Sequence, residues 1–568
     1  MDHPIRKERH MKIACVGAGA SGLCFAYKLQ RSFEDFTLTL IERNDAVGGV
    51  WVTNRYPGCA CDYEAHNYTF SWDQKADWTS VYAGAEEVQH YFEDFARKHG
   101  LLAYCRFGTT LKKAQWDDAS GRWNLQLQGR NGVEWGDDCD ILINASGLLS
   151  SPKWPGIPGL EGFRGLKLHS AAWPTSAEEL TDKTIGLVGN GSSGQQILEA
   201  LQPVSSHLTV FVRQPTWVLG PFGAPPHRYT TSELQDFTES PDALLAKRKH
   251  FENRVNSYFG ICLKDSPQQA ALRRHLTQNV RGRLTGSKYE DTDAMNTAFI
   301  PQYAVGCRRP TPGTKYIESL TAANVTLVVG PIARITADGV VDHEGVSHQV
   351  DALICATGFD TSHRPSFALL GKGGKDLREL WSLEEPNAYL ALAVPDFPNY
   401  FVFYGPNNPF ASGPFLATVE AQADYMLRWC DRWQTENIHS FSPKQEAVNE
   451  FKDHADAVIQ KTVWSDSCSS WYKAAPSQPA KVSLWPGSGL HYMEAISSLR
   501  SDDFDVRYRG NRWEWLGNGF SQVEQDEECD LSYYIRTQDD GEFLSSKKRR
   551  RARTKGSHVD RQSLHVIG

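Results

Sequence analysis

The sequence lacks any apolar run long enough to cross a membrane. Its mean hydropathy is −0.47, and no segment approaches the roughly 18 consecutive apolar residues that indicate a membrane-spanning helix. Residues 1–19 carry positive charges but no apolar core of a secretory signal. We therefore expect an intracellular, cytoplasmic protein without a membrane span. The basic run 547–555 leaves nuclear targeting open as an alternative to a solvated tail.

Cysteine is sparse and irregularly placed, and neither sign of charge is in large excess. The chain has 12 cysteines among 568 residues, without the spacing of a disulfide framework, so we expect reduced thiols. Cys59 and Cys61 form a CxC pair without a second ligand pair, and we predict no metal site. The net charge of −8 argues against binding to nucleic acid. The length predicts two or three domains.

A nucleotide-binding pattern stands near the N-terminus. A buried strand predicted over 12–16 is followed by Gly17, Gly19 and Gly22, then a helical pattern and a strand that ends at Glu42. The glycines allow a tight turn, close approach of a pyrophosphate and close helix–strand packing. The helix N-terminus faces the phosphates. Glu42 would accept the ribose hydroxyls, and its charge disfavours a 2′-phosphate, so this site suits FAD or NAD.

The same pattern recurs in the middle of the chain. A strand predicted over 184–188 leads into Gly189, Gly191 and Gly194, and the next strand ends at Arg213 instead of an acid. A cation at this place accepts a 2′-phosphate, which favours NADPH, although a solvated arginine at a strand end is the alternative. Two dinucleotide sites in one chain are economically explained by electron flow from NADPH to FAD.

These patterns predict an α/β fold with two Rossmann-like dinucleotide-binding domains. Apolar strands over 141–147 and 353–358 are the expected points where the chain crosses between them. The charged stretch 232–283 predicts a helical insertion in the NADPH domain, either a structural elaboration or a substrate lid. The expected parts are the FAD domain (1–149 and, with the substrate region, 386–545), the NADPH domain (150–225 and 301–385), the helical insertion (226–300) and a basic tail (546–568).

Three motifs make the pattern more specific. Residues 48–62 read GGVWVTNRYPGCACD, residues 163–174 fit FxGxxxHxxxWP at every defined position, and residues 355–360 read CATGFD. In this order they resemble the Baeyer–Villiger monooxygenases, flavoenzymes that insert oxygen beside a ketone. Later stretches such as PNYFVFYGPNNPF and TVWSDSCSSWYK look like the fungal natural-product branch, whose substrates are polyketide or terpenoid ketones.

The resemblance implies a chemistry and its residues. NADPH would reduce FAD, O₂ would give a flavin C4a-peroxide, and attack on a small-molecule ketone would yield an ester or lactone. A permanently charged guanidinium suits the negative charge that develops. Arg309, in CRRPTPGTKY, matches the family's catalytic arginine, and Asp62 matches the aspartate that positions it. Taken singly, they would be a turn arginine and a capping aspartate.

The resemblance also assigns cofactor contacts. His169 is expected to hydrogen-bond backbone and couple domain movement rather than transfer protons, and a purely structural histidine is the alternative. Gln214 replaces a threonine common in relatives, and Arg308 replaces a lysine at the 2′-phosphate. The implied FAD contacts beyond the glycine turn are Trp51, Ala60, Cys61, Asp62, Tyr68 and Leu111. The implied NADPH contacts are Asn190, Gly191, Ser192, Ser193, Gly194, Gln195, Gln196, Arg213, Gln214, Arg308 and Arg309.

Two other functions stay open at this point. One is an N- or S-oxygenating flavin monooxygenase of the same fold, which the Arg309–Asp62 match and Trp173-Pro174 disfavour. The other is a non-catalytic NADPH-sensing or scaffold protein, which the intact glycines disfavour. The sequence predicts no oligomeric state.

Overall fold

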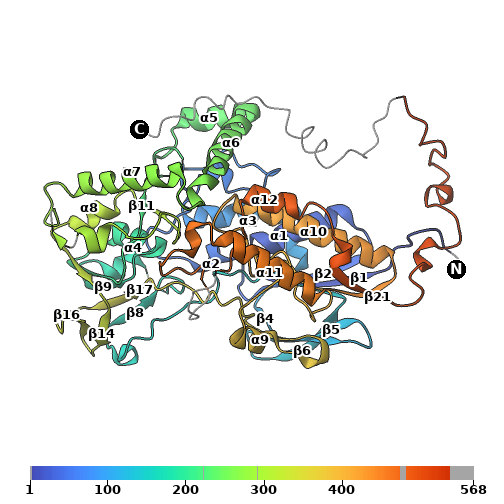
Figure 1. Cartoon of the computed structure of the whole chain (residues 1–568), viewed down its shortest axis with the longest axis horizontal. Coiled ribbons are helices and arrows are strands. Elements are labelled where there is room, and N and C mark those ends of the chain that lie inside the picture. The colour runs from blue at the N-terminus through green and yellow to red at the C-terminus, as the bar shows by residue number, and fades with distance from the viewer. Residues whose placement is uncertain are drawn as a thin grey trace.

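The computed structural model describes residues 3–174, 176–221, 223–290, 292–293, 295–473 and 482–537. The predicted basic tail, 546–568, lies outside these residues. Two five-stranded parallel sheets form the framework, and they lie at opposite ends of the molecule in Figure 1. Within the described ranges, no helix is both long and apolar enough to cross a membrane. We call the part around the sheet of β1 (Met11–Val16) the first half and the part around the sheet of β9 (Thr184–Val188) the second half.

The sheet of the first half is built from segments far apart in sequence. Its strand order is β19-β7-β1-β2-β3, and every neighbouring pair is parallel. Helix α1 (Ala20–Ser32) follows the glycine turn and buries one face against the sheet and α10. The strands are β1 (Met11–Val16), β2 (Phe36–Ile41), β3 (Cys105–Arg106), β7 (Ile141–Asn144) and β19 (Tyr400–Val402).

The sheet of the second half repeats this plan. Its order is β13-β10-β9-β17-β8, again parallel throughout, and α4 (Ser192–Leu201) follows its glycine turn. The edge strand β8 lies within the FxGxxxHxxxWP stretch, so that stretch is part of the sheet as well as a connection. The strands are β8 (Leu166–His169), β9 (Thr184–Val188), β10 (His207–Val212), β13 (Val325–Val329) and β17 (Ala352–Cys355).

Each half also carries an antiparallel meander, which precedes β7 in the first half and β17 in the second half. In the first half, β4 (Thr109–Asp117), β5 (Arg122–Gly129) and β6 (Glu134–Cys139) form it, and β18 (Ala368–Leu370) joins parallel to β4. In the second half, β14 (Ile332–Ile335), β15 (Gly339–Asp342) and β16 (Ser347–Gln349) form it. A two-stranded ladder joins β11 (Val218–Leu219) to β12 (Thr311–Pro312).

Helices cover the sheets and the space between them. The predicted insertion is helical: α5 and α6 stand above the junction of the halves and α7 above the second half in Figure 1. A capping box at Thr230 and Glu233 starts α5. The remaining helices are α2 (Val50–Thr53), α3 (Ala85–Lys98), α5 (Thr231–Glu239), α6 (Pro241–Asn256), α7 (Pro267–Leu284), α8 (Tyr316–Thr321), α9 (Leu377–Leu383), α10 (Phe415–Thr435), α11 (Gln445–Ile459) and α12 (Gly489–Ala495). Strands β20 (Ile438–Pro443) and β21 (Phe504–Tyr508) form an antiparallel pair, with α11 and α12 between them in sequence.

The chain crosses between the halves twice, and the two crossings are bonded to each other. The amide of Lys153 donates to the carbonyl of Gly358 at 2.9 Å, and the amide of Asp360 donates to the carbonyl of Ser151 at 2.9 Å. His169 lies fully buried beside them. Its Nδ1 accepts from the amide of Ala171 at 3.1 Å, so its Nε2 carries the proton and donates to the carbonyl of Lys153 at 3.3 Å. These contacts are structural, and burial lowers the pKa of His169.

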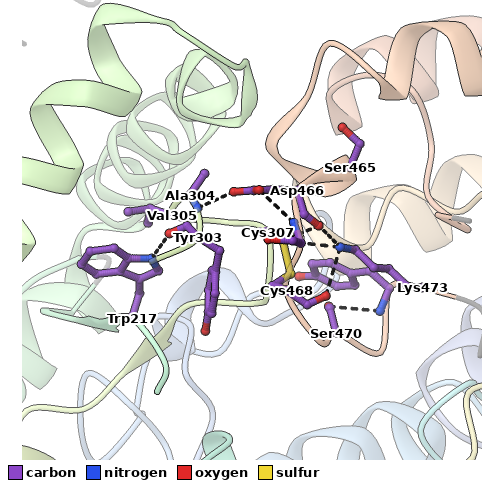
Figure 2. Close-up of a disulfide and its surroundings, with 12 residues drawn as sticks. Trp217, Tyr303, Ala304, Val305, Cys307, Ser465, Asp466, Cys468, Ser470 and Lys473 are labelled. Atoms are coloured by element: carbon purple, nitrogen blue, oxygen red, sulfur yellow. Dashed lines mark hydrogen bonds between the residues drawn. A yellow bond between two sulfur atoms is a disulfide. The ribbon is translucent and has the colours of Figure 1, made fainter. Parts of the chain in front are cut away.

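The expectation that all cysteines are free thiols is wrong for two of them. Cys307 and Cys468 form a disulfide, although they lie 161 residues apart in the sequence. Figure 2 shows the bond joining a turn of the second half to the loop over residues 466–473. This loop belongs to the stretch after β19, which we call the C-terminal part. A bond between such distant segments leaves no spacing pattern, because only the fold brings the sulfurs together.

Candidate active site

A cavity of about 2000 Å³ lies where the two halves and the helical insertion meet. The first half contributes several residues between Val50 and Tyr68, the second half its glycine turn and Arg213, and the insertion the end of α6 and part of α7. The C-terminal part closes it with Phe410, Trp471 and Tyr472. Large ligand sites favour such a junction of domains with mainly apolar walls and a few charged groups.

Asp62 and Arg309 form an ion pair on the cavity wall. Arg309 Nη2 donates to Asp62 Oδ2 at 2.6 Å, with the side chains 32% and 21% exposed. Asp62 ends the YPGCACD stretch of the first half, and Arg309 lies in the turn just before β12 of the second half. The pair therefore ties two segments 247 residues apart and points a fixed cation at the cavity.

Aromatic side chains surround this arginine. The Arg309 guanidinium carbon lies 5.5 Å from the centre of the Phe410 ring, within the range of a cation–π contact. Burial opposes the charge of Arg309, but the Asp62 carboxylate and Tyr472 outweigh it, so the pKa of Arg309 is raised. Arg309 therefore stays a cation in a largely apolar surrounding.

The YPG turn of the first half contacts the glycine-turn helix of the second half. Gln196, on α4, accepts from the Tyr56 hydroxyl at 2.8 Å and donates to the carbonyl of Ala60 at 3.1 Å. A Cβ on Gly58 would lie 2.7 Å from the Gln196 carbonyl oxygen, so only glycine fits there. This contact sets Asp62 beside the second half.

On the first-half side of the cavity, two predicted aromatics contact each other. Trp51 Nε1 donates to the Tyr68 hydroxyl at 3.2 Å, and the rings meet edge to face. Burial raises the pKa of Tyr68, so its hydroxyl stays protonated. Ala60 and Cys61 also line the cavity.

On the second-half side, two arginines flank the glycine turn. Arg308 Nη2 donates to Asn190 Oδ1 at 3.3 Å, and Asn190 Nδ2 donates to the Gln214 carbonyl at 2.8 Å. Arg213 is exposed at the end of β10, and its Nη2 donates to Ser469 Oγ at 3.4 Å. Both arginines line the cavity, together with the predicted residues Asn190, Gly191, Ser192, Ser193, Gln196 and Gln214.

Some predicted residues do not line the cavity. Glu42 is buried and accepts from the amide of Ala18 at 2.9 Å, so it braces the glycine turn. Leu111 is buried in β4, and Gln195 is buried beneath the second turn. The predicted residues absent from the cavity lining are Gly17, Gly19, Gly22, Glu42, Leu111, Gly194 and Gln195.

The two glycine turns fit phosphate-bearing cofactors. Helices α1 and α4 begin at Gly19 and Gly191, and neither has a side-chain cap or an acidic residue in its first turn. Their first N–H groups and positive dipole ends therefore lack a side-chain acceptor, as an anion-binding helix start requires. The residues present thus fit a dinucleotide in each half.

Several cavity residues were not predicted from the sequence. Phe410 and Tyr472 stand beside Arg309, and Lys473 lies 3.6 Å from the Cys307 sulfur. The stretches PNNPF and CSSWYK resemble the fungal natural-product branch, but nothing in their sequence indicates that they lie beside Arg309.

The comparisons with known proteins agree with this architecture. Residues 15–84 match a family model described as an NAD(P)-binding Rossmann-like domain. The FAD-binding monooxygenase stcW of Emericella nidulans is 35% identical over 529 residues, covering 91% of this chain and 86% of that protein. The FAD-binding monooxygenase tazF of Aspergillus terreus is 36% identical over 540 residues, covering 93% and 95%.

The solved structures show the same relationship. The NADP⁺-bound structure of cyclohexanone monooxygenase from Rhodococcus sp. Phi1 superposes with a TM-score of 0.75 and 25% identity, covering 88% of this chain and all of that one. The chain belongs to the Baeyer–Villiger family of FAD-binding monooxygenases. It is an enzyme with two dinucleotide-binding domains, and its cofactors are FAD and NADPH.

Proposed function

We propose that the enzyme inserts one oxygen atom of O₂ beside the carbonyl of a ketone, giving an ester or a lactone. The observation that carries this proposal is the Arg309–Asp62 ion pair on the cavity wall. When bound and reduced by NADPH, the flavin supplies an activated oxygen atom taken from O₂. FAD would be held by the first glycine turn with Trp51 and Tyr68, and NADPH by the second with Arg213 and Arg308.

Arg309 has the properties that carbonyl oxygenation requires. Negative charge develops on oxygen during attack on a carbonyl, and a positioned cation stabilises it. One Arg309 nitrogen holds Asp62, and a guanidinium carries five N–H donors, so donors remain for a reacting oxygen. Asp62 fixes the direction of the guanidinium. Oxygenation of amines or thioethers needs no such cation, which makes it the less favoured alternative.

The walls suggest the substrate class. Aromatic residues from three separate segments line the cavity, and they suit a large apolar ketone. We propose a polyketide or terpenoid carbonyl compound of natural-product biosynthesis, a class consistent with the fungal origin of the relatives. The wall residues that support this are Tyr258, Phe410, Phe415, Trp464 and Trp471.

Replacement of Arg309 tests the reaction. Arg309→Ala should leave flavin reduction by NADPH within a few-fold of wild type and lower ester formation about a hundred- to a thousandfold. The measurements are anaerobic flavin reduction and product masses over ketones and thioethers. Arg334→Ala, which alters an exposed arginine of β14 outside the cavity, is the control. Wild-type yields of ester from Arg309→Ala would refute the assignment, and oxygenated thioethers without esters would favour S-oxygenation.

A further inference from the structure

A disulfide holds the 466–473 loop against the turn that carries Arg308 and Arg309. Cys307 directly precedes the two arginines, and Cys468 lies in the loop (Figure 2). The loop lines the cavity with Ser469, Ser470, Trp471, Tyr472 and Lys473. The covalent bond therefore joins two walls of the same cavity.

The loop is also tied to this turn by hydrogen bonds. The Asp466 carboxylate accepts from the amide of Ala304 at 2.8 Å and from the amide of Ser467 at 2.8 Å. Buried Gln269 fixes the turn itself, because it bonds both the amide and the carbonyl of Val305. The turn is thus anchored to α7, and the disulfide and the Asp466–Ala304 bond hold the loop against it.

The same loop reaches both cofactor-facing arginines. Ser469 Oγ accepts from Arg213, the residue proposed for the 2′-phosphate, at 3.4 Å. Three residues on, Tyr472 contributes to the electrostatic surrounding of Arg309. Movement of the loop would alter both ends of the NADPH site at once.

The surroundings of the disulfide favour its exchange with thiols. Cys468 is 6% exposed and lies between two exposed serines, whereas Cys307 is 0% exposed, so Cys468 is the residue of the pair nearer to solvent. Lys473 Nζ lies 3.6 Å from the Cys307 sulfur and donates to the carbonyls of Asp466 and Cys468. A neighbouring ammonium stabilises a thiolate, and a stabilised thiolate leaves faster in exchange.

We propose that Cys307 and Cys468 form a reversible thiol–disulfide site that latches the 466–473 loop over the NADPH side of the cavity. A low-molecular-weight thiolate such as glutathione attacks Cys468 Sγ, the Cys307–Cys468 bond breaks, and Cys307 leaves as a thiolate beside Lys473. A second thiol removes the first from Cys468 as the small disulfide. Two electrons pass from the small thiols to the protein, and oxidation by the small disulfide reverses both steps.

The latch does not depend on which substrate the enzyme oxygenates. Its two states differ in how freely the loop opens, because a covalent link removes the open conformations. In a compartment rich in reduced thiols the latch opens, and oxidation closes it. The affinity of the enzyme for NADP⁺ thereby depends on the ratio of reduced to oxidised small thiols.

Titration of the wild-type holoenzyme tests the chemistry. The FAD-loaded protein is equilibrated over a series of reduced-to-oxidised glutathione ratios, and free thiols are trapped by alkylation and quantified by peptide mass. Cys307 and Cys468 should pass together from alkylated to disulfide-bonded, while cysteines such as Cys15 and Cys139 remain thiols. Alkylation of both residues at every ratio would overturn the proposal.

The latch itself is tested by binding and amide exchange. Reduction should speed hydrogen exchange in the 466–473 loop about tenfold and weaken NADP⁺ binding to the holoenzyme about tenfold. Cys468→Ser should reproduce the reduced state under oxidising conditions, and Cys529→Ser, at a free cysteine elsewhere, should not. Identical exchange and NADP⁺ affinity in both redox states would overturn the latch. None of these measurements requires ester formation. Their results can therefore be interpreted even if the enzyme does not oxygenate ketones.

Lys473 is tested through the exchange rate. Lys473→Met should slow reduction by glutathione about tenfold, because the Cys307 thiolate loses its stabilising charge, and Lys473→Arg should restore most of the rate. Equal rates in Lys473→Met and wild type would show that the charge of Lys473 does not assist the exchange.

Discussion

The two halves of the molecule are built on one plan and differ in the charged residue that follows the second strand of each nucleotide-binding unit. In each, a parallel sheet leads into a glycine turn and a helix without a side-chain cap. At the end of the next strand, the first half has Glu42, buried and bonded to its own turn, and the second half has Arg213, exposed toward the cavity. The two turns therefore share one backbone plan that suits phosphate, and we propose that the charged residue distinguishes their cofactors.

The strictest test of the shared plan is the third glycine of each turn. A Cβ on Gly22 would lie 2.1 Å from the Gly17 oxygen, and one on Gly194 would lie 2.3 Å from the Gly189 oxygen. We expect Gly22→Ala to lose most of its bound flavin. Gly194→Ala should keep its flavin and bind NADP⁺ at least about a hundredfold more weakly, because the helix must shift from its sheet. Flavin absorbance per protein and NADP⁺ titration measure the two effects. Equal loss of flavin in both variants would show that the halves do not act separately.

The charge difference is tested at Arg213. Arg213→Ala should raise the KM for NADPH about ten- to a hundredfold, because a charge-assisted hydrogen bond contributes about 1.5–3 kcal/mol. The KM for NADH, which lacks the 2′-phosphate, should change little. Steady-state NADPH and NADH oxidation measures both constants, with Arg334→Ala as control. A parallel rise for NADH would mean that Arg213 supports the loop rather than the phosphate.

A smaller effect, on the pH dependence of folding stability, is expected from the buried histidines of the two halves. His66, in the first half, is 1% exposed, and burial lowers its pKa to about 4. It accepts from Tyr229 and donates to the Ala76 carbonyl, with Lys75, Lys247 and Arg248 nearby. The unfolded chain takes up this proton first as the pH falls below about 6.5, so stability declines from there toward pH 4.

For His66 alone the loss at pH 5.5 is about 1.4 kcal/mol relative to pH 8. Thermal unfolding of wild type and His66→Gln over this pH range should show a flatter dependence in the variant. His169→Gln should change the slope in the same direction, because burial lowers that pKa too. Parallel curves for wild type and His66→Gln would contradict the burial argument.

Much of the fold could be predicted because its signals are local. The strand–glycine–helix units lie within about 40 residues of sequence, and the structure has β1, α1, β2, β9, α4 and β10 where the periodicity indicated them. The predicted partners Asp62 and Arg309 do meet, which family motifs indicated and spacing could not.

Contacts between distant segments could not be predicted. Cys307 with Cys468, Phe410 with Arg309 and Lys473 with the disulfide are brought together only by the packing of the halves and the C-terminal part. Glu42 was predicted for the ribose, and its bond to the Ala18 amide, which braces the turn, depends on side-chain geometry that a pattern does not contain.

The paired crossings between the halves carry a mechanical consequence. Because residues 151–153 and 358–360 run antiparallel and hydrogen-bond each other, the halves are joined by a two-stranded ribbon rather than two independent tethers. A ribbon twists and bends about one axis more readily than it shears. The ribbon adds to the Tyr56–Gln196 and Asp62–Arg309 contacts, so a backbone cut in one crossing would leave the halves joined.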